Sequence, residues 1–358
     1  MTDKENLAAA LAAELDKSIG GSDDNQEVKY WLDTGFPHLN KIISGRIDGG
    51  LGFGRLYEIF GPSSVGKTAL ATKVMVEAQR LGGCAIFIDY EHTFDVGMAQ
   101  RSMGLNTTSP YWIYKQPETW EQGNAIACRA VELIRKSGAI DAEAPIVVVQ
   151  DSIAAAVPKS MLYDSKGNRR EMDEYTMNDT TALARVTSTT LKVIAALTER
   201  SMATFVYLNQ IRTKPGVLFG DPTGTPGGQA MEFYASGRLS LGRSTITEGS
   251  GMDKELTGQI IRAKCVKSKH TRPFGTAELS LHFDDTGMAY FDDIESIITW
   301  MIRQKILETS GSRINWGGKS LYKKDVIKAL HKAENGKKLL IDVIRKAVPV
   351  PPGEEPSA

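Results

Sequence analysis

An eight-residue segment carries the clearest chemistry in this 358-residue sequence. Residues 61–68 read GPSSVGKT and match the pattern GxxxxGK[ST]. In this pattern backbone amides wrap phosphates, Lys67 reaches the β- and γ-phosphate oxygens, and the Thr68 hydroxyl ligates Mg²⁺. An apolar strand-like run precedes the motif and a helical stretch follows it, which is the context that phosphate binding requires. The sequence therefore predicts a nucleoside triphosphate site, with these expected contacts: Gly61, Pro62, Ser63, Ser64, Val65, Gly66, Lys67, Thr68 and Ala69.

A triphosphate hydrolase also needs a carboxylate for the metal ion and a group that activates the attacking water. Asp151 closes the apolar run IVVVQ, so it is expected at a strand end, where it either faces the metal or caps the next segment. Three residues compete for the role of general base, because Asp89, Glu91 and His92 all lie at or just past the end of the run CAIFID. Residue types alone do not separate these three.

The elements that must position these residues follow an α/β pattern from about residue 29 to 295. Short runs that are apolar on both faces alternate with helical stretches, which is typical of a parallel sheet covered by helices on both sides. The later runs 237–243, 258–269 and 276–283 alternate apolar and polar residues and lie close together in the chain. They predict antiparallel strands added at one edge of a mostly parallel sheet.

Two smaller parts flank this core. Residues 2–19 have Leu at every fourth position and predict an amphipathic helix, which packs either on its own core or on a neighbouring subunit. Residues 296–347 look mostly helical and rich in lysine, and a Pro-rich tail follows. We therefore expect residues 1–28 to be a subunit-docking helix and linker, 29–295 the core, and 296–358 a small helical C-terminal domain.

Composition limits the class of protein. Lys and Arg number 43, Asp and Glu number 43, and the charged fraction of 24% is ordinary for a globular chain. The three cysteines have no CxxC spacing, and neither a signal peptide nor a bilayer-length apolar run is visible, so a cytoplasmic protein without a membrane partner is expected. The zero net charge excludes a uniformly basic protein only, because residues 262–272 and 166–170 gather cations locally.

Six segments occur in an order that resembles one family, the RecA family of bacterial and phage recombinases, which form ATP-dependent filaments on single-stranded DNA. The segments are GPSSVGKTAL, IFIDYEHTFD, VVVQDS, LNQIRTKPGVLFG, GTPGGQAMEFYAS and KCVKSKHTRPF. The resemblance runs from about residue 30 into the C-terminal part. It implies a RecA-type P-loop ATPase core, with ATP and Mg²⁺ as cofactors.

The resemblance also implies catalytic roles. Glu91 falls on the glutamate that activates water, and Gln210 on the glutamine that senses the γ-phosphate. Lys267 and Lys269 fall on two lysines that reach the ATP of the neighbouring subunit. Thr68 and Asp151, indicated by the phosphate-loop pattern and by the strand end, are the expected Mg²⁺ ligands.

The residues expected to contact the adenine base depart in part from the family pattern. Asp95 is kept at the position that reads the adenine, whereas Met98 stands where an aromatic residue typically stacks on the base.

For DNA, the resemblance implies one helix face and two loops. The loops are residues 161–180 and 212–229. The expected contacts are Arg185, Ser188, Lys192, Arg212, Gly227, Gly228 and Gln229. Binding would be largely independent of base identity.

The function expected from the resemblance is a DNA-stimulated ATPase that polymerises on single-stranded DNA as a helical filament, with ATP at subunit interfaces. The filament would pair its strand with a homologous duplex and exchange strands. A hexameric motor and a small-molecule kinase are the alternatives for a P-loop chain.

Overall fold

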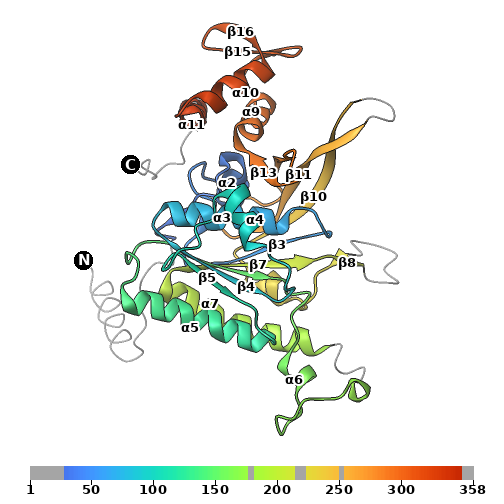
Figure 1. The fold of residues 1–358 in the computed structure, drawn as a ribbon. Coiled ribbons are helices and arrows are strands. Elements are labelled where there is room, and N and C mark those ends of the chain that lie inside the picture. The colour runs from blue at the N-terminus through green and yellow to red at the C-terminus, as the bar shows by residue number, and fades with distance from the viewer. Residues whose placement is uncertain (1–27, 176–180, 214–222, 250–253, 349–358) are drawn as a thin grey trace, which may run out of the picture.

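The computed structural model describes residues 28–175, 181–213, 223–249 and 254–348. Its centre is a large twisted sheet with helices on both faces, and the C-terminal elements stand at one end (Figure 1). Within the described residues, no helix combines the length and the apolar character needed to cross a membrane.

Nine strands form the central sheet, in the order β13-β12-β11-β10-β3-β7-β6-β4-β5. The contacts from β10 through β3, β7, β6 and β4 to β5 are parallel, and those joining β10, β11, β12 and β13 are antiparallel. Both the parallel sheet and its antiparallel edge agree with the expectation from the sequence. The strands are β3 (Leu56–Gly61), β4 (Cys84–Asp89), β5 (Trp112–Lys115), β6 (Ile146–Asp151), β7 (Ala203–Gln210), β10 (Gly237–Glu248), β11 (Glu255–Ser268), β12 (Thr276–Phe283) and β13 (Ala289–Asp292).

The sheet separates two apolar cores because successive side chains of each strand point to opposite faces. In β6, Val147 and Val149 face one core, while Ile146 and Val148 face the other. Helices α2, α3 and α4 cover the first face, and α5, α7 and α8 cover the second (Figure 1). The helices of the core are α2 (Pro37–Ser44), α3 (Lys67–Arg80), α4 (Val96–Met103), α5 (Trp120–Ser137), α6 (Lys159–Leu162), α7 (Ala182–Ser201) and α8 (Ala230–Tyr234).

The C-terminal elements have their own apolar cluster. It joins α9 (Asp293–Arg303), α10 (Lys323–Lys332) and α11 (Gly336–Ala347). Helix α9 begins before residue 296, so the expected boundary falls inside a helix.

The expectation of a mostly helical segment missed a small sheet. Its strands are β14 (Thr309–Ser310), β15 (Arg313–Trp316) and β16 (Lys319–Tyr322). The two-residue turn Gly317-Gly318 joins β15 to β16 with φ of 58° and 77°, which suits glycine and a tight hairpin.

Two further pairs of short strands lie outside the central sheet. Strand β1 (Trp31–Leu32) pairs antiparallel with β2 (Leu51–Gly52), and β8 (Arg212–Thr213) with β9 (Thr223–Gly224).

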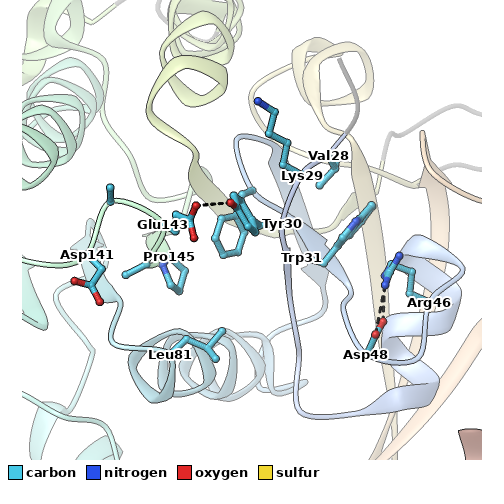
Figure 2. Close-up of a pocket in the computed structure, with 13 residues that line it drawn as sticks. Val28, Lys29, Tyr30, Trp31, Arg46, Asp48, Leu81, Asp141, Glu143 and Pro145 are labelled. Carbon is cyan, nitrogen blue, oxygen red and sulfur yellow. Dashed lines mark hydrogen bonds and ion pairs between the residues drawn. The ribbon is translucent and has the colours of Figure 1, made fainter. Parts of the chain in front are cut away.

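A groove of about 880 Å³ lies beside the first described residues, between the β1 segment and the loop before β6 (Figure 2). Tyr30 crosses it and donates a hydrogen bond to Glu143 at 2.6 Å. The helix expected at residues 2–19 lies outside the described residues.

Candidate functional site

Four parallel strands end at one edge of the sheet and bring the predicted residues together. Strand register places Gly61 beside Gln210 and Asp89 beside Asp151. Helix α3 begins at Lys67, directly after the loop that follows β3. Their shared edge explains why motifs far apart in the sequence line one cavity of about 440 Å³.

The loop before α3 has the form of a phosphate cradle. Gly66 has φ of 94°, and a Cβ there would lie 2.4 Å from Ile261, so the tight turn requires glycine. Lys67 Nζ donates to the carbonyl oxygens of Gly61 and Pro62 at 3.2 and 2.8 Å. Burial lowers the pKa of Lys67, although Asp151 and Glu91 oppose the shift.

The two predicted metal ligands touch each other. Thr68 Oγ1 donates to Asp151 Oδ2 at 2.7 Å. Burial raises the pKa of Asp151 to about 6, the Thr68 hydrogen bond lowers it, and the neighbouring carboxylates of Glu91 and Asp89 raise it further. A carboxylate oxygen beside a hydroxyl oxygen suits a hard divalent cation.

Glu91 lines the cavity and sits between two side-chain hydrogen-bond donors. Gln210 Nε2 donates to Glu91 Oε1 at 3.2 Å, and Ser152 Oγ donates to the same oxygen at 2.5 Å. The contact with Ser152 was not among the predicted ones, because nothing in the sequence distinguishes this serine from a helix cap. Glu91 is thus held at the mouth of the phosphate loop with its second oxygen, Oε2, outside these two bonds.

The competing acid, Asp89, accepts hydrogen bonds mainly from backbone amides. Its two oxygens accept hydrogen bonds from the amides of Glu91, His92 and Phe94 at 2.8–3.1 Å and from the Tyr114 hydroxyl at 2.8 Å. These bonds shape the loop that carries Glu91. His92 is exposed and does not line the cavity. The geometry therefore favours Glu91 over both alternatives.

The two residues expected at the adenine have partners of their own. Asp95 caps α4 by accepting a hydrogen bond from the Met98 amide at 2.8 Å. The Met98 side chain is half-buried against the first core. Contact of either residue with a base stays a prediction.

The antiparallel edge contributes residues that no motif marked. Arg243 of β10 donates to the Ser64 carbonyl at 2.7 Å, and Gln259 of β11 and Phe283 of β12 also line the cavity. Only their alternation along strands was visible in the sequence, and alternation gives no sign of which loop a strand will face.

The predicted DNA-facing residues on α7 share one exposed surface. Arg185, Ser188 and Lys192 are all exposed, at the spacing of successive helical turns. Gly227 and Gly228 pack close to this helix, since a Cβ on Gly228 would lie 3.1 Å from the Cβ of Ala184.

The predicted loops are only partly described. In the second loop, Arg212 and Gln229 are exposed, and residues 214–222 lie outside the described residues.

The first loop is a folded excursion rather than an irregular connection. Helix α6 leads into a bridge between Tyr163 and Arg169, and a short 3₁₀ helix, η1 (Met172–Glu174), follows. Glu118 at the start of α5 holds it by accepting from Tyr163 at 2.6 Å and pairing with Arg169 at 3.1 Å. Residues 176–180 lie outside the described residues.

A buried carboxylate links β7 to the second loop. Glu58 is fully buried and pairs with Arg238 at 2.6 Å, and Asn209 Nδ2 donates to its other oxygen at 2.9 Å. Asn209 also donates to the Pro226 carbonyl at 3.0 Å, directly beside Gln210. Asn209, which precedes Gln210 in the chain, thus joins β7 to the segment that ends the second loop.

Lys267 and Lys269, which are expected to reach the ATP of a neighbouring subunit, have different surroundings. Lys267 Nζ donates to the carbonyl oxygens of Glu232 and Phe233 at the end of α8. Burial, followed by the nearby cations of Lys269 and Arg238, lowers the pKa of Lys267 to about 8. Lys269 is exposed.

Known proteins resemble this chain over most of its length. The family described as RecA N-terminal domain matches residues 19–288. Protein RecA of Geobacter metallireducens is 32% identical over 326 residues, which cover 88% of this chain and 87% of that protein. Protein RecA of Clostridium perfringens is 33% identical over 88% of this chain and 83% of its own length. Protein RecA of Thermus thermophilus is 36% identical over 75% of this chain and 71% of its own length.

Proposed function

This chain belongs to the RecA family, and on that premise we propose how its own residues carry out the work of an ATP-dependent DNA recombinase. The protein is a DNA-dependent ATPase that promotes homologous pairing and strand exchange.

The residues at the sheet edge fit a Mg²⁺-nucleotide. The glycine-shaped loop offers backbone amides at the start of α3, Lys67 points along that loop, and Thr68 and Asp151 supply two adjacent oxygens. The metal ion, when bound, neutralises charge on the phosphate oxygens. Lys67 gives up its two carbonyl partners for phosphate, and Arg243 stabilises the loop from the neighbouring strand.

Glu91 positions and deprotonates the attacking water. Its oxygens face the cavity, and Ser152 and Gln210 fix the side chain that carries them. Gln210 exchanges its bond to Glu91 for one to the γ-phosphate, and Asn209 passes that movement to the second loop. Lys267 and Lys269 act on the nucleotide of the adjacent subunit, so full activity requires assembly.

Single-stranded DNA lies against α7 and the two loops. Arg185 and Lys192 bind phosphate, Ser188 donates a hydrogen bond, and the Gly227-Gly228 turn lets the strand approach the backbone. Binding is sequence-tolerant because it uses charge and amides. The subunits assemble as a helical filament, with residues 1–28 docking on a neighbour.

One observation carries this assignment: Gln210 lies in direct hydrogen-bond contact with Glu91, and it ends the strand that leads into the second loop. A residue shared by the hydrolytic site and a DNA loop makes ATP turnover depend on DNA. The test is ATP hydrolysis with and without single-stranded DNA, with Lys67→Ala as the nucleotide-site control. We expect stimulation by DNA that Lys67→Ala abolishes. Hydrolysis indifferent to DNA would contradict the proposal.

A further inference from the structure

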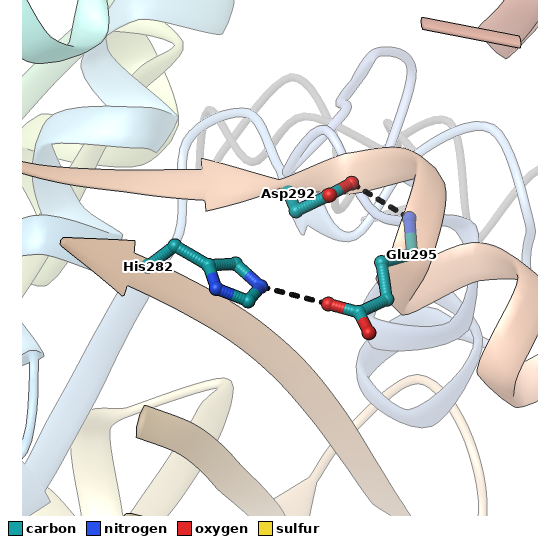
Figure 3. Close-up of side chains that lie close together, drawn as sticks. All are labelled: His282, Asp292 and Glu295. Carbon is teal, nitrogen blue, oxygen red and sulfur yellow. Dashed lines mark hydrogen bonds and ion pairs between the residues drawn. The ribbon is translucent and has the colours of Figure 1, made fainter. Parts of the chain in front are cut away.

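A cluster of two histidines and two carboxylates lies where the antiparallel edge meets the C-terminal elements, far in sequence from the nucleotide motifs. His282 comes from β12, Asp292 ends β13, and Glu295 lies in the first turn of α9 (Figure 3). Their possible ligand atoms all lie within 4.8 Å of one another. His331 of α10 joins through Asp292, with Nε2 at 3.0 Å from Oδ2.

The ion pairs of this cluster are made by histidines and not by lysine or arginine. The ion pairs of Glu295 and Asp292 within the described residues are to His282 at 2.8 Å and to His331 at 3.0 Å. Lys323 acts on Glu295 through its charge, although its hydrogen bond goes to Thr299 at 3.0 Å. With both imidazoles neutral, the two carboxylates have only this lysine and the α9 amide that Asp292 Oδ1 accepts at 2.7 Å to offset their charge within the described residues.

The neighbouring carboxylate shows the contrast. Asp293 follows Asp292 directly in sequence but pairs with two lysines, Lys73 at 2.8 Å and Lys337 at 2.9 Å. A purely structural ion pair at this junction thus uses lysine, whereas the adjacent cluster uses ligands that coordinate transition metals.

We propose that His282, Asp292, Glu295 and His331 form a structural site for a divalent transition-metal ion of the zinc type. The donor set of two imidazoles and two carboxylates suits four-coordinate Zn²⁺, which binds such atoms at about 2.0–2.2 Å. Donors around such an ion lie roughly 3.3–3.5 Å apart, so closing the shell requires rotation of the three half-buried side chains and of the exposed His331. The ion ties β12, β13, α9 and α10 together.

The test is a Co²⁺ titration of the full-length protein after EDTA treatment, in Mg²⁺ buffer without nucleotide. We expect one Co²⁺ per chain, with the visible absorption of a tetrahedral ion, and displacement by Zn²⁺. His282→Gln should abolish the signal, and Glu295→Gln, which keeps a partner for His282, should weaken affinity at least about tenfold. Asp325→Asn, an exposed carboxylate on α10, is the matched control and should bind normally.

Two results would overturn the site: no tetrahedral absorption in the unchanged protein, or an absorption that both His282→Gln and Glu295→Gln leave unaltered. The second result would assign the metal to another histidine. If His282→Gln fails to fold, as judged by circular dichroism, Glu295→Gln decides. Because the readout needs neither ATP nor DNA, its failure is separate from failure of the recombinase assignment.

Discussion

At the scale of single residues, the acids of the site differ in what already occupies their oxygens. Asp89 receives three backbone amides and a tyrosine hydroxyl, whereas Glu91 receives only two side-chain donors and faces the cavity. The sequence placed both beside one strand end and could not rank them, because the rank depends on a loop conformation set by Asp89 itself. The family resemblance favoured Glu91 for a different reason, and its role as the base stays a prediction.

The first prediction concerns Glu91→Gln. The amide keeps the size of the side chain and its contacts but removes the base, so turnover should fall by about 10²–10⁴-fold. ATP-dependent binding of single-stranded DNA should survive, as measured by fluorescence anisotropy beside a hydrolysis assay. Glu132→Gln, an exposed carboxylate on α5, is the control. Loss of nucleotide binding in Glu91→Gln would mean that Glu91 is structural.

Asp151→Asn should separate stability from activity. Burial, opposed in part by Thr68, raises the pKa of Asp151 to about 6, so above that pH the folded protein holds a poorly solvated anion. The amide should stabilise the nucleotide-free, Mg²⁺-free protein by about 1–3 kcal/mol at pH 8 while abolishing Mg²⁺-dependent hydrolysis. Thr68 can still donate to the new side chain.

The pH dependence of that gain has a definite sign. A raised folded-state pKa means that the folded protein takes up a proton before the unfolded chain does as the pH falls. The stabilising effect of Asp151→Asn should therefore shrink as the pH falls through about 6 toward 3.8, the ordinary pKa of an aspartate side chain. Urea unfolding of both proteins over this range measures it, and a gain that is constant with pH would argue against the buried anion.

At the scale of elements, the long periodic segments were predictable and the short irregular ones were not. The alternation of apolar runs and helical stretches predicted the parallel sheet, and the ends of the apolar runs predicted the position of the nucleotide loop. Strands β14 to β16 were missed because two to four residues carry too little pattern, and only the Gly317-Gly318 turn marks them. The fold of the first loop was also unreadable, since it depends on Glu118, distant in sequence.

Helix α7 allows a prediction for DNA binding. Lys192→Ala should weaken binding about equally for all single-stranded sequences and reduce the slope of log affinity against log salt by about 1, as expected for one lost phosphate contact. Arg200→Ala, an exposed cation in the last turn of the same helix, should leave the slope unchanged. Equal effects of the two substitutions would show that Lys192 contributes only general charge.

At the scale of the whole molecule, a partly buried ion network connects the helix that follows the nucleotide loop to the C-terminal elements. Asp293 of α9 pairs with Lys73 of α3 and with Lys337 of α11. Burial alone would raise the pKa of Asp293, but the two lysines lower it overall. Neither this network nor the local basic surfaces could be predicted from the balanced composition, because the total numbers of acidic and basic residues carry no information about their positions.

Asp293→Ala should therefore cost about 1–3 kcal/mol of unfolding free energy, because Lys337 loses its ion pair while Lys73 keeps Glu77 at 3.2 Å. Denaturant unfolding followed by circular dichroism measures the change. Asp325→Ala, at an exposed site on α10, should change stability by less than about 0.5 kcal/mol. A similar small loss in Asp293→Ala would mean that water solvates the junction.

Homology-dependent strand exchange tests the central claim most directly. The protein, ATP and Mg²⁺ are incubated with a circular single strand and a linear duplex, and joint molecules are counted. The account predicts joint molecules only when the two DNAs share sequence, and none with Lys67→Ala. Joint molecules formed without homology, or none formed by a protein that binds both DNA and ATP, would contradict it.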